Sequence, residues 1–271
     1  MTPILIAAGA LVAVVAAARS TWSPCGVSML ATITPLAESA RGHRYRSTAR
    51  WFVAGAVAGG LTLGLVLGVV ALGVGAAGLG TGTLAVLACL ASVVAAASDA
   101  RVGGFALPVH HRQVNERWLD QFRPWVYGAG FGWQIGTGFV TYIKTAGVYL
   151  VALLAVLTGS WRAAVLLGTL FGLVRGLAVY LGRTITTPAQ LADFHRRFVR
   201  LGVVVLAVVI ATECAGATLF GWLASPWAGA AVLLLVAAVC GTRVLRRRAR
   251  PARPAGAGAR AELADAPAAR S

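Results

Sequence analysis

Residues 3–37 read PILIAAGALVAVVAAARSTWSPCGVSMLATITPLA, an apolar run whose only charged side chain is Arg19. As one continuous helix this run would be about 52 Å long, whereas the hydrocarbon core of a bilayer is about 30 Å thick. Pro24 and Pro35 lie inside the run, and proline removes a helical hydrogen bond and kinks the chain. The run therefore predicts a membrane-spanning helix that is broken in its middle.

Six further apolar segments follow, at 51–75, 79–98, 125–157, 162–182, 201–223 and 226–242. Segment 125–157 is also too long for one crossing, and it contains five glycines between 128 and 138. The sequence thus predicts an all-α integral membrane protein with about seven transmembrane helices, of which the first and fourth are broken. We expect a polytopic transmembrane domain over 1–245 and a disordered, basic cytoplasmic tail over 246–271.

The composition excludes several classes of protein. Hydrophobic residues make up 58% of the chain and charged residues only 12%, about half of what soluble domains carry. The mean hydropathy is +0.79. A soluble globular enzyme, a disordered chain and a disulfide scaffold are all incompatible with these values, and the environment they require is the lipid bilayer.

The net charge of +16 would suggest a nucleic-acid partner in a soluble protein. Here, however, 20 of the 24 basic residues follow predicted spans 1, 3, 5 and 7, all on one side of the membrane. By the positive-inside rule this bias places the N-terminus outside and the C-terminus in the cytoplasm. We therefore expect a multi-pass protein of the plasma (inner) membrane that binds no nucleic acid.

The two broken segments resemble each other. Trp22-Ser-Pro-Cys-Gly-Val-Ser aligns with Trp133-Gln-Ile-Gly-Thr-Gly-Phe, which predicts repeat halves at about 3–98 and 125–223 and an extra helix at 226–242. Each half would contain three spans, so the second copy is inverted in the membrane. Inverted repeats with paired broken helices are typical of alternating-access proteins, whose binding sites lie near the midplane where the broken helices meet.

Cys25 directly follows Pro24 at the first break. A helix that begins there would direct its unpaired N–H groups and positive dipole at the sulfur, which favours the nucleophilic thiolate. The alternative is a small apolar cysteine packed in a helix.

Residues 22–30 resemble the first helix of the CcdA/DsbD family of transmembrane thiol–disulfide electron carriers, and Phe131-Gly132-Trp133 resembles the start of that family's fourth helix. The resemblance covers residues 3–222. It implies transfer of reducing equivalents from cytoplasmic thioredoxin to extracytoplasmic thioredoxin-like acceptors, as in cytochrome c biogenesis, and it implies thioredoxin-like partners on both sides of the membrane.

The chain departs from that family at one decisive point. The family has a second Pro-Cys in the fourth helix, whereas the equivalent residues here are Ile135 and Gly136. A thiol–disulfide cycle needs two sulfurs. Cys89 and Cys214, in the middles of the third and sixth spans, are the candidates for the second one.

Charged residues inside the predicted spans give the competing hypothesis. Arg19, Lys144, Arg175 and Glu213 are costly in lipid and should face a cavity or a partner. We expect Glu213 to pair with Arg175 or Lys144. With Pro24 and Gly136, the charged residues would line a positively charged cavity, which suits a secondary transporter of a small anionic or thiol-containing solute. A purely structural ion pair is the alternative. No cofactor and no metal site are expected.

Overall fold

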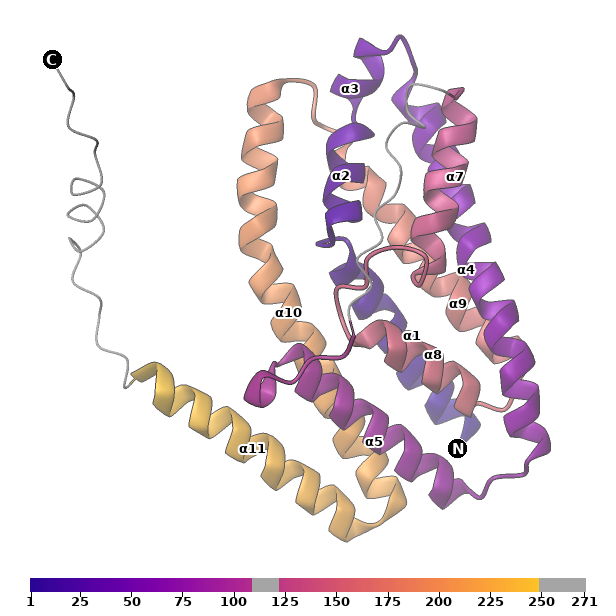
Figure 1. The fold of residues 1–271 in the computed structure, drawn as a ribbon, viewed down its shortest axis with the longest axis vertical. Helices are drawn as coiled ribbons and strands as arrows, with labels where there is room; N and C mark the ends of the chain where they lie inside the picture. Colours follow the sequence, from indigo (N-terminus) through magenta and orange to yellow (C-terminus); the bar gives the residue numbers. More distant parts are fainter. Residues whose placement is uncertain (109–121, 249–271) are drawn as a thin grey trace, which may run out of the picture. The chain divides into compact units, whose positions relative to one another are not determined.

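The computed structural model describes residues 1–108 and 122–248, the last nine by their backbone alone. This part of the chain is helical, without strands, and five of its helices are long and apolar enough to cross a membrane. The predicted all-α membrane fold is therefore confirmed, while the predicted tail from residue 249 lies outside the described residues. The elements are α1 (Thr2–Ser20), α2 (Pro24–Thr32), α3 (Pro35–Ala40), α4 (Tyr45–Ala76), α5 (Thr81–Asp99), η1 (Val102–Gly104), α7 (Pro124–Thr137), α8 (Gly147–Leu157), α9 (Trp161–Leu177), η2 (Ala178–Gly182), α10 (Pro188–Ala224) and α11 (Pro226–Arg248) (Figure 1).

The first long segment is broken where its prolines are. Helix α1 ends at Ser20, and α2 begins at Pro24 with Ser23 as its cap, since the Ser23 hydroxyl accepts a hydrogen bond from the Gly26 amide at 3.2 Å. A second interruption precedes Pro35, where Thr34 caps α3 in the same way. Proline is favoured at the first position of a helix because its missing N–H would be unpaired there anyway. The predicted break is therefore confirmed.

The second long segment is broken as well. Helix α7 ends at Thr137, and Gly138 follows with φ +72°, a left-handed conformation that glycine adopts at little cost. The backbone is irregular until α8 begins at Gly147. Irregular backbone at membrane depth is tolerated only where protein or a cavity surrounds it, so both breaks mark the region in which a site should be sought.

Helix α4 packs against α7 and α9 through glycines. A Cβ atom added at Gly55 would lie 2.1 Å from the carbonyl oxygen of Ala129, and one at Gly60 would lie 2.3 Å from that of Gly168. Such distances mean that the helix backbones touch, which is how membrane helices gain packing energy in the absence of a hydrophobic driving force. We call the contact of α4 with α9 around Gly60 and Gly168 the glycine seam.

Tryptophans mark two levels along the helices. Trp51 and Trp125 lie at one level, with ring centroids 6.0 Å apart. At the other level Gly75 of α4 packs against Gly159, two residues before Trp161. The stretch of α4 between the two levels is about 36 Å long at 1.5 Å per residue, close to the thickness of a bilayer core. Tryptophan prefers the membrane–water interface, so these levels fit the two faces of a membrane.

The helix pairs α4 with α9 and α5 with α10 each pack closely, as counterparts in a two-fold repeat would. Within the breaks the proposed alignment is offset, however. Trp22 lies in the first break, whereas Trp133 lies inside α7, before the second break. The repeat of 3–98 and 125–223 thus remains a prediction, with Trp22 and Trp133 at different places relative to the breaks.

Candidate functional site

Cys25 lies at the second position of α2, directly after the first break. Its residue is only 4% exposed, and Ser23 and Pro24 fix the helix start in front of it. Arg175 of α9 is close enough to interact electrostatically with Cys25. The free amides of the first helical turn and a cation both favour negative charge. The expected position of Cys25 at a helix N-terminus is therefore found, and a cation accompanies it.

Arg175 is 2% exposed and connects the two breaks. Its Nη1 donates to the hydroxyl of Thr141, in the second break, at 3.5 Å, and its Cζ lies 5.8 Å from the centre of the Phe171 ring. Nη2 is buried and has no hydrogen-bond partner within the described residues. Buried donors are nearly always paired. An Arg175 with an unused donor thus suits an anionic group, either a thiolate or a ligand.

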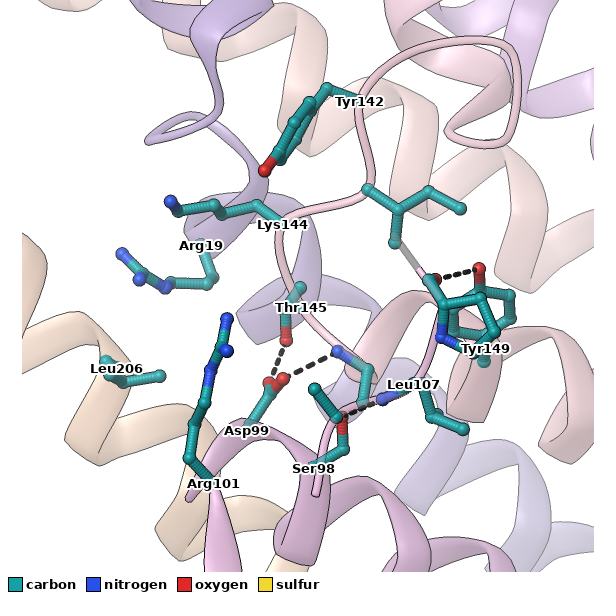
Figure 2. Close-up of a pocket in the computed structure, with 14 residues that line it drawn as sticks. Arg19, Ser98, Asp99, Arg101, Leu107, Tyr142, Lys144, Thr145, Tyr149 and Leu206 are labelled. Atoms are coloured by element: carbon teal, nitrogen blue, oxygen red, sulfur yellow. Dashed lines mark hydrogen bonds between the residues drawn. The ribbon is translucent and has the colours of Figure 1, made fainter. Parts of the chain in front are cut away.

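The second break also borders a cavity of about 170 Å³ (Figure 2). Arg19, Arg101 and Lys144 line it; the charged ends of Arg19 and Lys144 extend to the same side, and Arg101 extends upward beside Asp99. Asp99, at the end of α5, also lines the cavity. We call this cavity the vestibule; Arg19 and Lys144 were predicted from the sequence as charges inside the membrane.

Asp99 stabilises the start of α8. Its carboxylate accepts hydrogen bonds from the Thr145 hydroxyl and from the Ala146 amide, the latter at 2.7 Å. A carboxylate at a helix N-terminus pairs with free amides and with the helix dipole. Asp99 directly follows the predicted span 79–98, where hydropathy gives no signal for a role in capping another helix.

Glu213 lies beside the same helix start. It is 1% exposed, and a Cβ atom added at Gly147 would lie 3.4 Å from its Oε1. Neither carboxylate oxygen has a hydrogen-bond partner among the described residues. The predicted pairing of Glu213 with Arg175 or Lys144 is wrong, because Arg175 contacts Thr141 and Lys144 extends into the vestibule.

The structure does not bring the other two cysteines to Cys25. Trp22, beside the first break, contacts Phe198 of α10, and Cys214 lies about 24 Å further along that helix. Cys89 of α5 donates its thiol hydrogen to the carbonyl of Ala217, further still from Phe198. Disulfide formation requires Cα atoms within about 7 Å. In this arrangement neither sulfur can serve as the partner of Cys25.

Two residues predicted to line the cavity have other roles. Pro24 is exposed and begins α2. Gly136 is buried against α4, and a Cβ atom added there would lie 2.0 Å from the carbonyl oxygen of Ala56. Close helix packing therefore explains a glycine at position 136. Within the described residues, no group of three or more His, Cys, Asp or Glu side chains could hold a metal ion.

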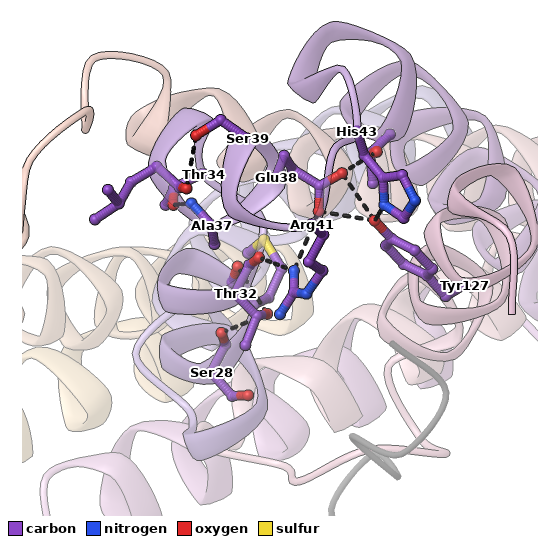
Figure 3. Close-up of polar contacts among 12 residues, drawn as sticks. Ser28, Thr32, Thr34, Ala37, Glu38, Ser39, Arg41, His43 and Tyr127 are labelled. Carbon is purple, nitrogen blue, oxygen red and sulfur yellow. Dashed lines mark hydrogen bonds and ion pairs between the residues drawn. The ribbon is translucent and has the colours of Figure 1, made fainter. Parts of the chain in front are cut away.

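A second polar cluster was not foreseen from the sequence (Figure 3). Glu38 of α3 is fully buried and accepts hydrogen bonds from the Tyr127 hydroxyl at 2.8 Å and from the Thr48 hydroxyl. Arg41 Nη1 lies 3.3 Å from Oε1 of Glu38, and Tyr127 is also 3.4 Å from Nδ1 of His43. The cluster joins α3, α4 and α7. Its only sequence signal is that Glu38 is the single acidic residue among the arginines after the first span.

Comparison with known proteins shows relatives named methylamine utilization protein MauF. The chain is 33% identical to the one from Paracoccus denitrificans over 166 residues, which cover 59% of this chain and 58% of the relative. It is 32% identical to the one from Paracoccus versutus over 183 residues, 66% of this chain and 65% of the relative. The match to the Methylorubrum extorquens protein is 34% over 160 residues, 58% and 56% of the two chains. The matched stretch thus spans less than two thirds of each of these relatives.

No family model matches the chain, and no solved structure does. The names of the relatives refer to methylamine utilization and not to thiol–disulfide exchange. The apolar helices and the relatives together indicate that this chain is a multi-pass membrane protein homologous to MauF proteins.

Proposed function

We propose, starting from the similarity to the MauF relatives, that this protein serves methylamine utilization as a membrane-embedded carrier of reducing equivalents. Its reactive group would be the thiol of Cys25. The observation that supports this proposal is the position of Cys25 at the N-terminus of α2 beside buried Arg175. The resemblance to the CcdA/DsbD family agrees with it, and thioredoxin-like proteins on the two membrane faces would be the partners.

The proposed chemistry uses one sulfur of this chain and two of each partner. The Cys25 thiolate attacks the disulfide of an extracytoplasmic acceptor; that S–S bond breaks, a mixed disulfide forms, and the released acceptor thiolate takes up a proton. A thiolate of a reduced cytoplasmic donor then attacks the Cys25 sulfur and releases the acceptor as a dithiol. The second donor thiol resolves the new mixed disulfide, which returns Cys25 as a thiolate and leaves the donor oxidised. One electron pair passes from donor to acceptor.

This scheme requires the donor to reach Cys25 from one membrane face while the acceptor is still bound to its sulfur from the other face, because the donor thiolate attacks the mixed disulfide itself. Two broken helices that meet at the site, as in alternating-access proteins, would provide a path from each face. The absence of Cys89 and Cys214 from the site is then no obstacle, since the partners provide the resolving thiols.

The test is to trap mixed disulfides in cells. The chain is expressed in a Paracoccus denitrificans strain that lacks its own relative, cells are quenched with acid, and thiols are alkylated. We expect reductant-sensitive adducts of higher mass in the wild type and in the Cys89→Ser/Cys214→Ser variant, and none in Cys25→Ser. Growth on methylamine should be lost only in Cys25→Ser. A Cys25→Ser variant that supports full growth would exclude the redox function.

A second function is favoured by a separate observation, the unpartnered Nη2 of Arg175. A small anionic or thiol-containing solute could bind there between the breaks and be transported on the same scaffold. In that case Arg175→Gln would abolish growth on methylamine, whereas Cys25→Ser would leave it intact. The two variants therefore separate the two functions.

A further inference from the structure

The vestibule carries a surplus of positive charge. Arg19, Arg101 and Lys144 line it together with one acidic residue, Asp99. Both oxygens of Asp99 already accept hydrogen bonds from Thr145 and Ala146 at the start of α8. Among the described residues that line the cavity, the cations thus outnumber the acids by two. Such a surplus of positive charge favours an anionic ligand.

Arg19 provides the first sign of a built binding site. Its residue is 9% exposed, and Nη1 donates to the carbonyl of Gly202 at 3.3 Å. Nε is buried without a hydrogen-bond partner in the part of the chain that the structure describes. Arg19, whose guanidinium group is held by α10 at one nitrogen and has a second nitrogen without a partner, is thus one of the residues that line the cavity.

Arg101 provides the second sign. It has φ +50° and ψ +49°, and it is the only residue other than glycine with positive φ in the described ranges. The left-handed conformation costs a side-chain-bearing residue roughly 1–2 kcal/mol. Residues in this conformation concentrate at functional sites, where the surroundings hold them. Here the conformation turns the chain directly after α5, so that Arg101 lines the vestibule with Asp99.

We propose that the vestibule binds an oxyanion, a carboxylate or phosphate group held by Arg19, Arg101 and Lys144. Arginine matches such groups because its planar N–H donors can bind two oxygens at once. The volume of about 170 Å³ is close to that of the engineered cavities of about 150 Å³ that hold benzene. The ligand is therefore a small soluble oxyanion or the phosphate of an anionic lipid headgroup.

The location connects the vestibule to both breaks. Arg19 precedes the first break, while Cys25 follows it; Lys144 and Thr141 belong to the second break, where Thr141 contacts Arg175. The second break thus contributes residues to both sites, while Arg19 and Cys25 stand on either side of the first break. The proposed anion site does not depend on the redox chemistry of Cys25, so either proposal can fail alone.

The experiment measures thermal unfolding of the purified full chain in neutral detergent. Inorganic phosphate and succinate are titrated at constant ionic strength against chloride. In parallel, the chain is placed in nanodiscs of phosphatidylcholine with or without phosphatidylglycerol. The variants are Lys144→Gln, whose side chain is exposed, and Arg101→Gln/Lys144→Gln. The matched control is Arg46→Gln, which removes one charge from a different basic surface formed by Arg44, Arg46 and Arg50.

We expect saturable stabilisation of the wild type, and a loss of apparent affinity of at least about tenfold in the double variant because two charge-assisted contacts are removed. Arg46→Gln should respond like the wild type. Stabilisation by phosphate or succinate identifies a soluble oxyanion, and stabilisation by phosphatidylglycerol alone identifies a lipid headgroup. The proposal is overturned if neither stabilises the chain or if the double variant responds like the wild type. Cys25→Ser should bind normally, whatever the outcome of the trapping experiment.

Discussion

The indole nitrogen of Trp22 donates a 2.7 Å hydrogen bond to the carbonyl oxygen of Phe198, and the two rings stack with centroids 4.2 Å apart and planes within 3°. Gly202, one turn further along α10, leaves room for the indole, since a Cβ atom there would lie 2.9 Å from Trp22 Cδ1. The first break is thereby fixed to the N-terminal half of α10, which sets the position of Cys25 three residues later.

Trp22→Ala should therefore destabilise the protein more than an ordinary tryptophan substitution. The variant loses the stacked ring and leaves a cavity, which typically costs about 3–5 kcal/mol. Trp22→Phe keeps an aromatic ring but not the hydrogen bond, at a cost of about 1 kcal/mol. Chemical unfolding in detergent measures both. Trp227→Ala is the control, because Trp227 is 86% exposed, and an equal loss in the control would contradict the anchoring role of Trp22.

Gly60→Ala should weaken the glycine seam strongly. The added methyl group would lie 2.3 Å from the Gly168 carbonyl oxygen and 2.9 Å from the Gly172 backbone, so α4 and α9 must separate. Overpacking of this kind costs about 1–3 kcal/mol. Gly73→Ala is the matched control on the same helix, since nothing lies within 4 Å of a Cβ atom there. It should be neutral or stabilising, because alanine has the higher helix propensity. Similar melting temperatures for both variants would refute the close contact.

Glu213→Leu should increase the stability of the protein. Both carboxylate oxygens are buried without a hydrogen-bond partner among the described residues, and such a polar group costs about 1–3 kcal/mol. Leucine removes that cost at similar volume. The melting temperature in detergent is the measurement, and Glu213→Gln, which retains unsatisfied polar atoms, is the control. A stability loss in Glu213→Leu would reveal a partner for this carboxyl group.

The same geometry predicts that Glu213 and Arg175 act independently. A double-mutant cycle between Glu213→Gln and Arg175→Gln should be additive in unfolding free energy within about 0.5 kcal/mol. A larger coupling energy would restore the ion pair that the sequence suggested.

Tyr127→Phe tests the cluster around Glu38. The variant removes a donor at 2.8 Å from a fully buried carboxylate, and the expected cost is about 1–3 kcal/mol. Tyr149→Phe is the control, because the Tyr149 hydroxyl donates to the Pro108 carbonyl at an exposed position. Equal effects of the two substitutions on the free energy of unfolding would mean that the cluster does not stabilise the contact of α3 with α4 and α7.

Much of the helical layout could be predicted from the sequence because lipid allows few alternatives. Backbone groups must be paired within each segment, so long apolar runs become helices, and Pro24, Pro35 and Gly138 mark where those helices stop. The lengths of α4 and α10 were underestimated, since polar turns such as the capping box at Thr187 extend helices beyond the apolar run. The hydropathy pattern does not show that a helix continues through such polar turns.

The partners of the charged residues could not be predicted in the same way. The sequence places Arg175 and Glu213 at membrane depth. It does not show toward which neighbouring segment each side chain points. Their partners depend on the route of the irregular backbone between Gly138 and Gly147, for which no periodicity exists. Asp99 escaped notice for a related reason: its role as a cap for α8 arises only when two distant segments meet.

The glycine seam has a genetic consequence. At Gly60 the obstacle to a larger residue is the backbone of α9, not a side chain. No second substitution in α9 can make room, because its facing residues, Gly168 and Gly172, are already the smallest possible. A screen for suppressors of a damaging Gly60 substitution should therefore return true revertants or changes elsewhere in the chain, but no compensating exchange across the seam. The close contact of α4 with α9 therefore requires glycine on both helices at once.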